Sequence, residues 1–111
     1  LLSLLHELKL KGKRIAGYGA SAKGNTLLNY FGITHEILEY MVDDSSWKQG
    51  RYTPGTHIPV VAAQKLAEER PDYILILAWN FAEQIMEKLK DSGFMATSLY
   101  VEAQAVFVIL R

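Results

Sequence analysis

The stretch that decides the fold is Arg14-Ile-Ala-Gly-Tyr-Gly-Ala-Ser-Ala-Lys-Gly-Asn-Thr-Leu-Leu-Asn29. A short apolar run breaks there into glycine and small residues, and apolar residues then resume at helical spacing. This pattern predicts a strand at 15–18, a tight turn, and a helix at 21–31 that Gly32 ends. This stretch therefore predicts a strand, a turn and a crossover helix.

The turn between this strand and helix is a candidate anion site. Gly17, Gly19 and Ala20 leave the backbone bare, so the amides at the start of the helix can approach an anionic group closely. Ser21 can cap the helix, and Lys23 can place a point charge beside a phosphate. We therefore expect a phosphorylated ligand at this turn, with a ligand-free turn as the structural alternative.

The turn departs from the full dinucleotide fingerprint Gly-x-Gly-x-x-Gly. Ala22 stands where the third glycine belongs, and Gly24 follows two residues later. Alanine is a tolerated variant at that position. Asp43 ends the predicted second strand, at about the separation at which a Rossmann acid receives ribose hydroxyls. A nucleotide ligand is consistent with this spacing.

The rest of the chain continues to alternate between strands and helices. Strands are predicted at 37–42, 59–61, 73–78, 97–101 and 105–110, and helices at 1–10, 62–69 and 81–91. This alternation predicts one α/β domain over residues 1–111, a Rossmann-like three-layer α/β/α fold with a mostly parallel sheet. Residues 45–57 form the long irregular segment, a kind of loop that is often functional.

Polar residues follow the strands at the sheet edge where open α/β folds bind ligands. His57, in the irregular loop, can bond a sugar or phosphate or simply fix the loop. Trp79 and Asn80 directly follow the predicted strand at 73–78. The Trp79 ring can stack on a base or sugar, and Asn80 can orient polar groups or cap the next helix.

Composition narrows the classes of function. The chain of 111 residues has 12 basic and 12 acidic side chains, so non-specific nucleic-acid binding has little charge to draw on. The absence of cysteine excludes disulfides, thiolate zinc sites and a cysteine nucleophile, and favours a cytoplasmic location. No apolar run reaches the roughly 20 residues of a membrane-spanning helix. We expect neither a nucleic-acid nor a membrane partner.

Catalytic and metal-binding patterns are weak in the chain itself. The adjacent acids Asp43 and Asp44 more often cap a turn than hold a metal. Ser21 lacks the strained Gly-x-Ser-x-Gly elbow of a hydrolase nucleophile. We therefore assign no catalytic residue and no metal ligand to this chain.

Several ordered motifs together resemble the C-terminal domain of sugar C-methyltransferases that depend on S-adenosylmethionine (SAM). They are Gly17-Tyr-Gly-Ala-Ser-Ala-Lys-Gly-Asn25, Leu27-Leu-Asn-Tyr-Phe-Gly32, Asp43-Asp44, Lys48-Gln-Gly-Arg-Tyr-Thr-Pro-Gly-Thr-His-Ile-Pro59 and Pro71-Asp-Tyr-Ile-Leu-Ile-Leu-Ala-Trp-Asn80. The resemblance covers residues 12 to about 95. One departure is Ala78, since family members usually have proline before the Trp-Asn pair.

The resemblance implies a piece of a longer enzyme that methylates nucleotide-linked keto-deoxysugars. The parent would deprotonate a carbon next to a 4-keto group, and the enolate carbon would attack the SAM methyl. SAM, zinc and the base belong to the missing parts, so this domain should hold no cofactor and should not methylate alone. Its partners would be the nucleotide-sugar and the SAM-binding domain of the same chain. The substrate-binding residues implied are Gly17, Tyr18, Gly19, Ala20, Ser21, Ala22, Lys23, Asp43, His57, Trp79 and Asn80.

Two alternatives remain open at this point. A regulatory Rossmann module for NAD, CoA or another nucleotide would need Asp43 free at the strand edge. The sugar-nucleotide role would instead need His57 and Asn80 turned towards the glycine turn. A purely structural domain would use an apolar face of its first helix to dock its neighbour, through Leu1, Leu4, Leu5 and Leu8.

Overall fold

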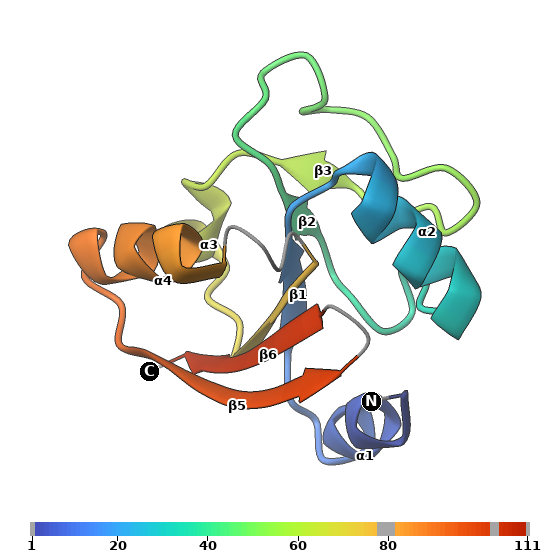
Figure 1. Ribbon diagram of the computed structural model, residues 1–111, viewed down its shortest axis with the longest axis horizontal. Coiled ribbons are helices and arrows are strands. Elements are labelled where there is room, and N and C mark those ends of the chain that lie inside the picture. Colours follow the sequence, from blue (N-terminus) through green and yellow to red (C-terminus); the bar gives the residue numbers. More distant parts are fainter. Residues whose placement is uncertain (1, 78–81, 103–104, 111) are drawn as a thin grey trace.

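A computed structural model describes residues 2–77, 82–102 and 105–110 (Figure 1). The strands are β1 (Ile15–Tyr18), β2 (Met41–Val42), β3 (Val60–Val61), β4 (Tyr73–Ile76), β5 (Ala96–Glu102) and β6 (Ala105–Leu110). The helices are α1 (Leu2–Leu10), α2 (Ala22–Phe31), α3 (Lys65–Glu68) and α4 (Ala82–Asp91). In these ranges no helix is long and apolar enough to cross a membrane.

The strands form one sheet in the order β3-β2-β1-β4-β6-β5. β3, β2, β1 and β4 pair in parallel, whereas β6 runs antiparallel to β4 and β5 antiparallel to β6. The predicted α/β fold with a mostly parallel sheet is confirmed. The antiparallel strands β6 and β5 complete one edge of the sheet. Antiparallel neighbours can be joined by a short hairpin and need no crossover helix.

Alternating side chains on the sheet build two cores, one on each face. Ile15 joins a cluster with residues of α1 and α2, whereas Ala16 and Tyr18 join residues of α3 and α4. Figure 1 shows α2 on one side of the sheet and α3 and α4 on the other. Successive strand residues point to opposite faces, so helices are needed on both sides. The three-layer architecture is confirmed.

The predicted strand at 37–42 is wrong over most of its length, since β2 comprises only Met41–Val42. Leu38 N–H instead donates to Thr34 O in a turn, and the side chains of Ile37 and Leu38 are buried in the core. A buried turn can place apolar residues as densely as a strand does, so the pattern alone cannot separate them. The helix predicted at 62–69 similarly shortens to α3, Lys65–Glu68.

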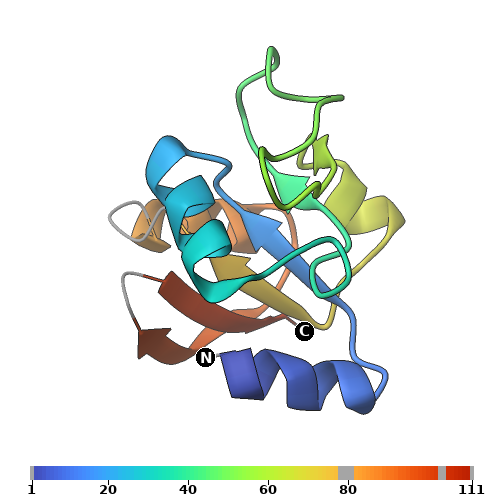
Figure 2. The same ribbon diagram turned by 90° about the vertical axis from the view of Figure 1, so that its right-hand side faces the viewer.

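The first helix belongs to the core of this domain. The side chains of Leu5 and Leu8 are buried in the cluster shared with β1 and α2. Figure 2 shows α1 lying along the lower edge of the domain. Docking of a neighbour through Leu5 and Leu8 is therefore wrong, because both side chains are already covered; Leu1 lies outside the described residues.

A matched pair of variants tests this role of α1. We expect Leu5→Ala to lower the free energy of unfolding by about 2–5 kcal/mol, because it opens a cavity in a core site. Leu4→Ala, at a partly buried position of the same helix, should cost clearly less. Urea unfolding measures both, and equal losses would contradict the placement of Leu5 in the core.

Candidate functional site

The glycine turn joins β1 to α2 as predicted. Gly19 has φ +98°, a left-handed conformation that favours glycine. Ser21 is the N-cap of α2, and its Oγ accepts a hydrogen bond from Gly24 N at 3.0 Å. Gly32 ends the helix in the left-handed region at φ +69°. The sequence thus predicted both ends of this helix within a residue.

Close packing of the helix onto the turn depends on Gly24. A Cβ at Gly24 would lie 2.8 Å from Gly19 O and 3.0 Å from Leu77 Cβ. Gly24 therefore takes the packing role that the dinucleotide fingerprint gives its third glycine. The sequence did not predict this role, because Gly24 stands two positions after the place of the third glycine in the fingerprint. The signal that could have revealed it is a glycine in the first turn of a helix.

Gly17 is buried within β1 rather than at the surface of the turn. A Cβ there would lie 2.6 Å from Met41 Cε and 2.7 Å from Met41 Sδ. The missing side chain leaves room for the methionine of the neighbouring strand. In the structure, Gly17 contributes to the packing of β1 against β2.

Asp43 connects the glycine turn to the loop after β2. Its Oδ2 accepts a hydrogen bond from Ala20 N at 2.9 Å, and its Oδ1 accepts one from Ser45 N at 2.8 Å. Only 9% of the residue is exposed. Lys48 Nζ donates to Ala20 O at 3.1 Å and lies 3.9 Å from Asp43 Oδ2. Both backbone polar groups of Ala20 are thus held by side chains, and Asp43 is not free at the strand edge.

A cavity of about 560 Å³ opens beside this turn. The turn and α2 provide one wall, and the irregular loop provides the other. The lining residues are Ala20, Ser21, Ala22, Asn25, Leu28, Trp47, Lys48, Arg51, Tyr52, Thr53, Pro54 and Val60. Three predicted residues, Ala20, Ser21 and Ala22, meet here, whereas Lys23 is exposed and is not among the lining residues.

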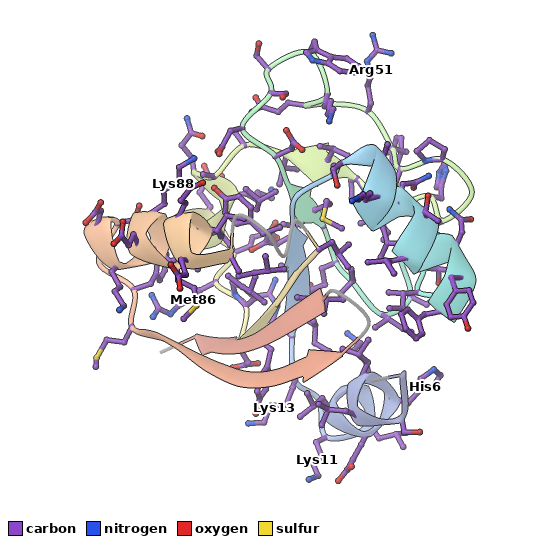
Figure 3. All side chains as sticks on the ribbon, in the orientation of Figure 1. His6, Lys11, Lys13, Arg51, Met86 and Lys88 are labelled. Atoms are coloured by element: carbon purple, nitrogen blue, oxygen red, sulfur yellow. The ribbon has the colours of Figure 1, made fainter. Side chains whose placement is uncertain are left out.

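The loop side of this cavity was missed by sequence reasoning. The segment has no hydrophobic period, so the sequence does not predict where its side chains point. The residues concerned are Trp47, Lys48, Arg51 and Tyr52. The available signal was aromatic and basic residues gathered in one long loop. Figure 3 labels Arg51 at the outer end of this loop, where its Nε donates to Trp47 O at 3.0 Å.

His57 supports a wall of the cavity without lining it. Its ring stacks on that of Tyr52, with 4.4 Å between centroids and 5° between planes. His57 adopts φ +58°, which is uncommon for a residue with a side chain. The Oγ1 atoms of Thr53 and Thr56, buried and 2.6 Å apart, tie the turn from within. His57 thus positions Tyr52.

Tyr18 faces the other side of the sheet. Its hydroxyl donates to Asp44 Oδ1 at 3.1 Å, and Lys88 Nζ lies 2.7 Å from Asp44 Oδ2. Figure 3 labels Lys88 on α4, at the opposite side of the domain from α2. Burial raises the pKa of Tyr18, and the nearby charge of Asp44 raises it further, so the phenol stays protonated. Tyr18 and Ser21 therefore do not meet at one cavity.

Two predicted contact residues, Trp79 and Asn80, lie outside the described residues. In the part of the chain that the structure describes, no group of three or more histidine or acidic side chains could hold a metal ion. Asp44 is paired with Tyr18 and Lys88, and Asp43 with backbone N–H groups. The two adjacent acids therefore serve different parts of the fold.

A family model described as the C-methyltransferase C-terminal domain matches residues 1–101. The chain belongs to this C-methyltransferase C-terminal domain family. Over 80 residues it is 41% identical to C-methyltransferase NovU of Streptomyces niveus, an alignment that covers 72% of this chain and 19% of that protein. The resemblance inferred from the motifs is confirmed at the level of the family. The chain spans a small part of that relative's length.

The role of Gly24 in this C-methyltransferase C-terminal domain can be tested by substitution. Alanine is favoured over glycine in a helix by about 1 kcal/mol. The new methyl group would nevertheless press against Gly19 O, so we expect Gly24→Ala to destabilise by roughly 1–3 kcal/mol. Thr26→Ala, exposed on the same helix, serves as the control and should stay within about 0.5 kcal/mol. A stabilised Gly24→Ala variant in denaturant unfolding would refute the close packing.

The two adjacent acids offer a second test in the C-methyltransferase C-terminal domain. Asp43→Asn leaves one of two N–H groups without an acceptor, so it should cost about 1–3 kcal/mol. Asp44→Asn changes an exposed pair and should cost less than about 1 kcal/mol. Amide hydrogen exchange should also quicken at Ala20 in Asp43→Asn alone. Slow exchange at Ala20 in that variant would contradict the contact.

Proposed function

We propose that this chain is the substrate-binding C-terminal domain of a SAM-dependent C-methyltransferase that acts on a nucleotide-linked keto-deoxysugar. Family membership supports the methyltransferase part of this proposal. The observation that carries the binding role is the cavity of about 560 Å³ between the glycine turn and the loop. Its volume lies in the range of small-molecule sites, about 300–1,000 Å³.

The phosphate end of such a ligand would lie at the start of α2. Ser21 and Ala22 line the cavity at the helix N-terminus, where the first backbone N–H groups have no partner within the helix. The helix dipole and Lys48, which also lines the cavity, both favour negative charge there. The rigid hydrogen bonds around Ala20 keep these groups in place.

The chemistry of methyl transfer belongs to the rest of the enzyme under this proposal. This chain would bind and orient the nucleotide-sugar, while SAM, zinc and the base that forms the enolate lie in other domains. Its partner would be the SAM-binding domain of the same polypeptide. The absence of cysteine agrees with the cytoplasm as its location.

The regulatory NAD or CoA module is less well supported. Such a module needs a free carboxylate at the end of the second strand to receive ribose hydroxyls. Asp43 instead accepts hydrogen bonds from the N–H groups of Ala20 and Ser45 and is almost fully buried. The ribose acceptor of a dinucleotide site is therefore already in use.

Calorimetric titration of the chain with dTDP, a dTDP-sugar, NAD and SAM tests the proposal. We expect the dTDP compounds to bind, and NAD and SAM to give no heat of binding. Ala22→Asp should weaken dTDP binding at least tenfold, or about 1.4 kcal/mol, because a carboxylate would then stand at the phosphate position. The helix should tolerate it, since acidic residues suit a first turn.

Thr26→Asp provides the control, because Thr26 is an exposed residue of α2 that does not line the cavity. It should leave dTDP affinity close to that of the wild type. Binding of NAD in preference to dTDP, or equal dTDP affinity in Ala22→Asp and wild type, would overturn the proposed function.

A further inference from the structure

The loop after β2 leaves the sheet and returns to it at nearly the same place. Figure 1 shows this loop extending away from the sheet between β2 and β3. On its way out, Asp43 N–H donates to Val61 O at 3.1 Å. On its return, Gly50 N–H donates to Val60 O at 2.9 Å. Both ends are thus bonded to consecutive residues of β3, and a compact loop with close ends can open locally without disturbing the strands that hold it.

The residues on either side of 45–49 give this segment fixed ends. Before it, the Asp44 carboxylate accepts hydrogen bonds from Tyr18 OH at 3.1 Å and from Lys88 Nζ at 2.7 Å. After it, Gly50 has φ +84°, and no described atom beyond its chain neighbours lies within 4 Å of the place where its Cβ would be. The backbone conformation, rather than packing, therefore requires glycine there. A small residue free to rotate at the end of a loop suits a hinge.

One side chain of residues 45–49 connects this segment to the glycine turn. Lys48 Nζ donates to Ala20 O at 3.1 Å, and the lysine side chain is 27% exposed. Within the part of the chain that the structure describes, no other hydrogen bond joins 45–49 to the glycine turn. The bond from Gln49 Nε2 to Asp43 O, at 2.9 Å, stays within the loop after β2. A single ammonium group therefore holds the segment against the turn.

Trp47 is carried by this segment rather than by the core. It lines the cavity and is nevertheless 68% exposed, so little packing opposes its movement. Lys48 Nζ lies 5.4 Å from the centre of the Trp47 ring, a distance at which a cation and an aromatic ring attract each other. The ring and the lysine are therefore expected to move together.

We propose that residues 45–49 form a lid over the cavity of about 560 Å³, with Lys48 as the catch that holds the lid closed. The lid opens as a unit between the fixed ends at Asp44 and Gly50. Release of Lys48 from Ala20 O moves Trp47 away from the cavity and leaves β3 and the glycine turn in place. Local openings of this kind cost less free energy than global unfolding. The lid controls access to the cavity whichever ligand enters it, so the inference goes beyond the proposed function.

Amide hydrogen exchange in the chain without ligand, followed by NMR, tests the lid. Lys48→Met should quicken exchange at residues 45 and 48 about tenfold, because the segment loses its bond from a charged donor. Exchange at Gly50, whose N–H is bonded to β3, should stay unchanged. Lys48→Arg keeps a donor and should exchange like the wild type, as should the control Lys90→Met, which alters an exposed lysine of α4. Equal quickening at Gly50, or none at residues 45 and 48, would overturn the lid.

Control of entry is tested by stopped-flow binding of dTDP, followed by tryptophan fluorescence, and this part rests on the proposed function. Lys48→Met should raise the association rate about threefold or more, because the binding-competent open state is more populated without the catch. A residue that only contacts the ligand would instead lower association when its positive charge is removed. Slower or unchanged association would therefore overturn control of entry. A wild type that binds no dTDP refutes the proposed function, whereas the exchange experiment still decides the lid.

Discussion

The hydrogen bonds between the carboxylate of Asp43 and two backbone N–H groups hold the candidate site together. One N–H belongs to Ala20 in the glycine turn and the other to Ser45 in the loop after β2. Lys48 adds a bond to Ala20 O from the loop side. A charged acceptor makes stronger hydrogen bonds than a neutral one, particularly where water is excluded. Without the Asp43 carboxylate, the bond from Lys48 would be the remaining polar contact of Ala20 with the loop, and the wall of the cavity would be held less firmly.

The parts of the fold that depend on local sequence were predictable. Ile15–Tyr18, the Ser21 cap, the first crossover helix and its Gly32 end all follow from residues within a few positions of one another. Capping and left-handed glycine are local chemistry, so they can be read without knowledge of distant contacts. The choice of a parallel sheet with helices on both faces also followed from the alternation of elements.

The parts that depend on distant residues were not predictable in the same way. The turn at 34–38 was predicted to be part of a strand because Ile37 and Leu38 are apolar. Both side chains are buried in the core, and it is this burial that requires apolar residues there. The function of Gly24 depends on Leu77, more than fifty positions away. Asp43 looked like a ribose acceptor from its position, but its two partners lie in different segments of the chain. In each case the role of the residue depends on a neighbour that is close in space but distant in the sequence, and the local pattern does not identify that neighbour.

Both carboxylate oxygens of Asp43 already accept hydrogen bonds from the backbone, so this residue is not available to recognise a ligand. In a dinucleotide fold the acid after the second strand contacts the ribose, so the sheet edge itself recognises the ligand. In this chain the corresponding acid, Asp43, instead holds the glycine turn and the loop together. The Tyr18 hydroxyl is hydrogen-bonded to Asp44 on the opposite face of the sheet. The cavity itself is lined mainly by residues of the loop and of α2, which are the groups left to contact a ligand under the proposed function. Loops tolerate substitution better than sheets do. A domain built in this way can change the ligand that it selects by altering the loop, while the hydrogen bonds that shape the glycine turn stay intact.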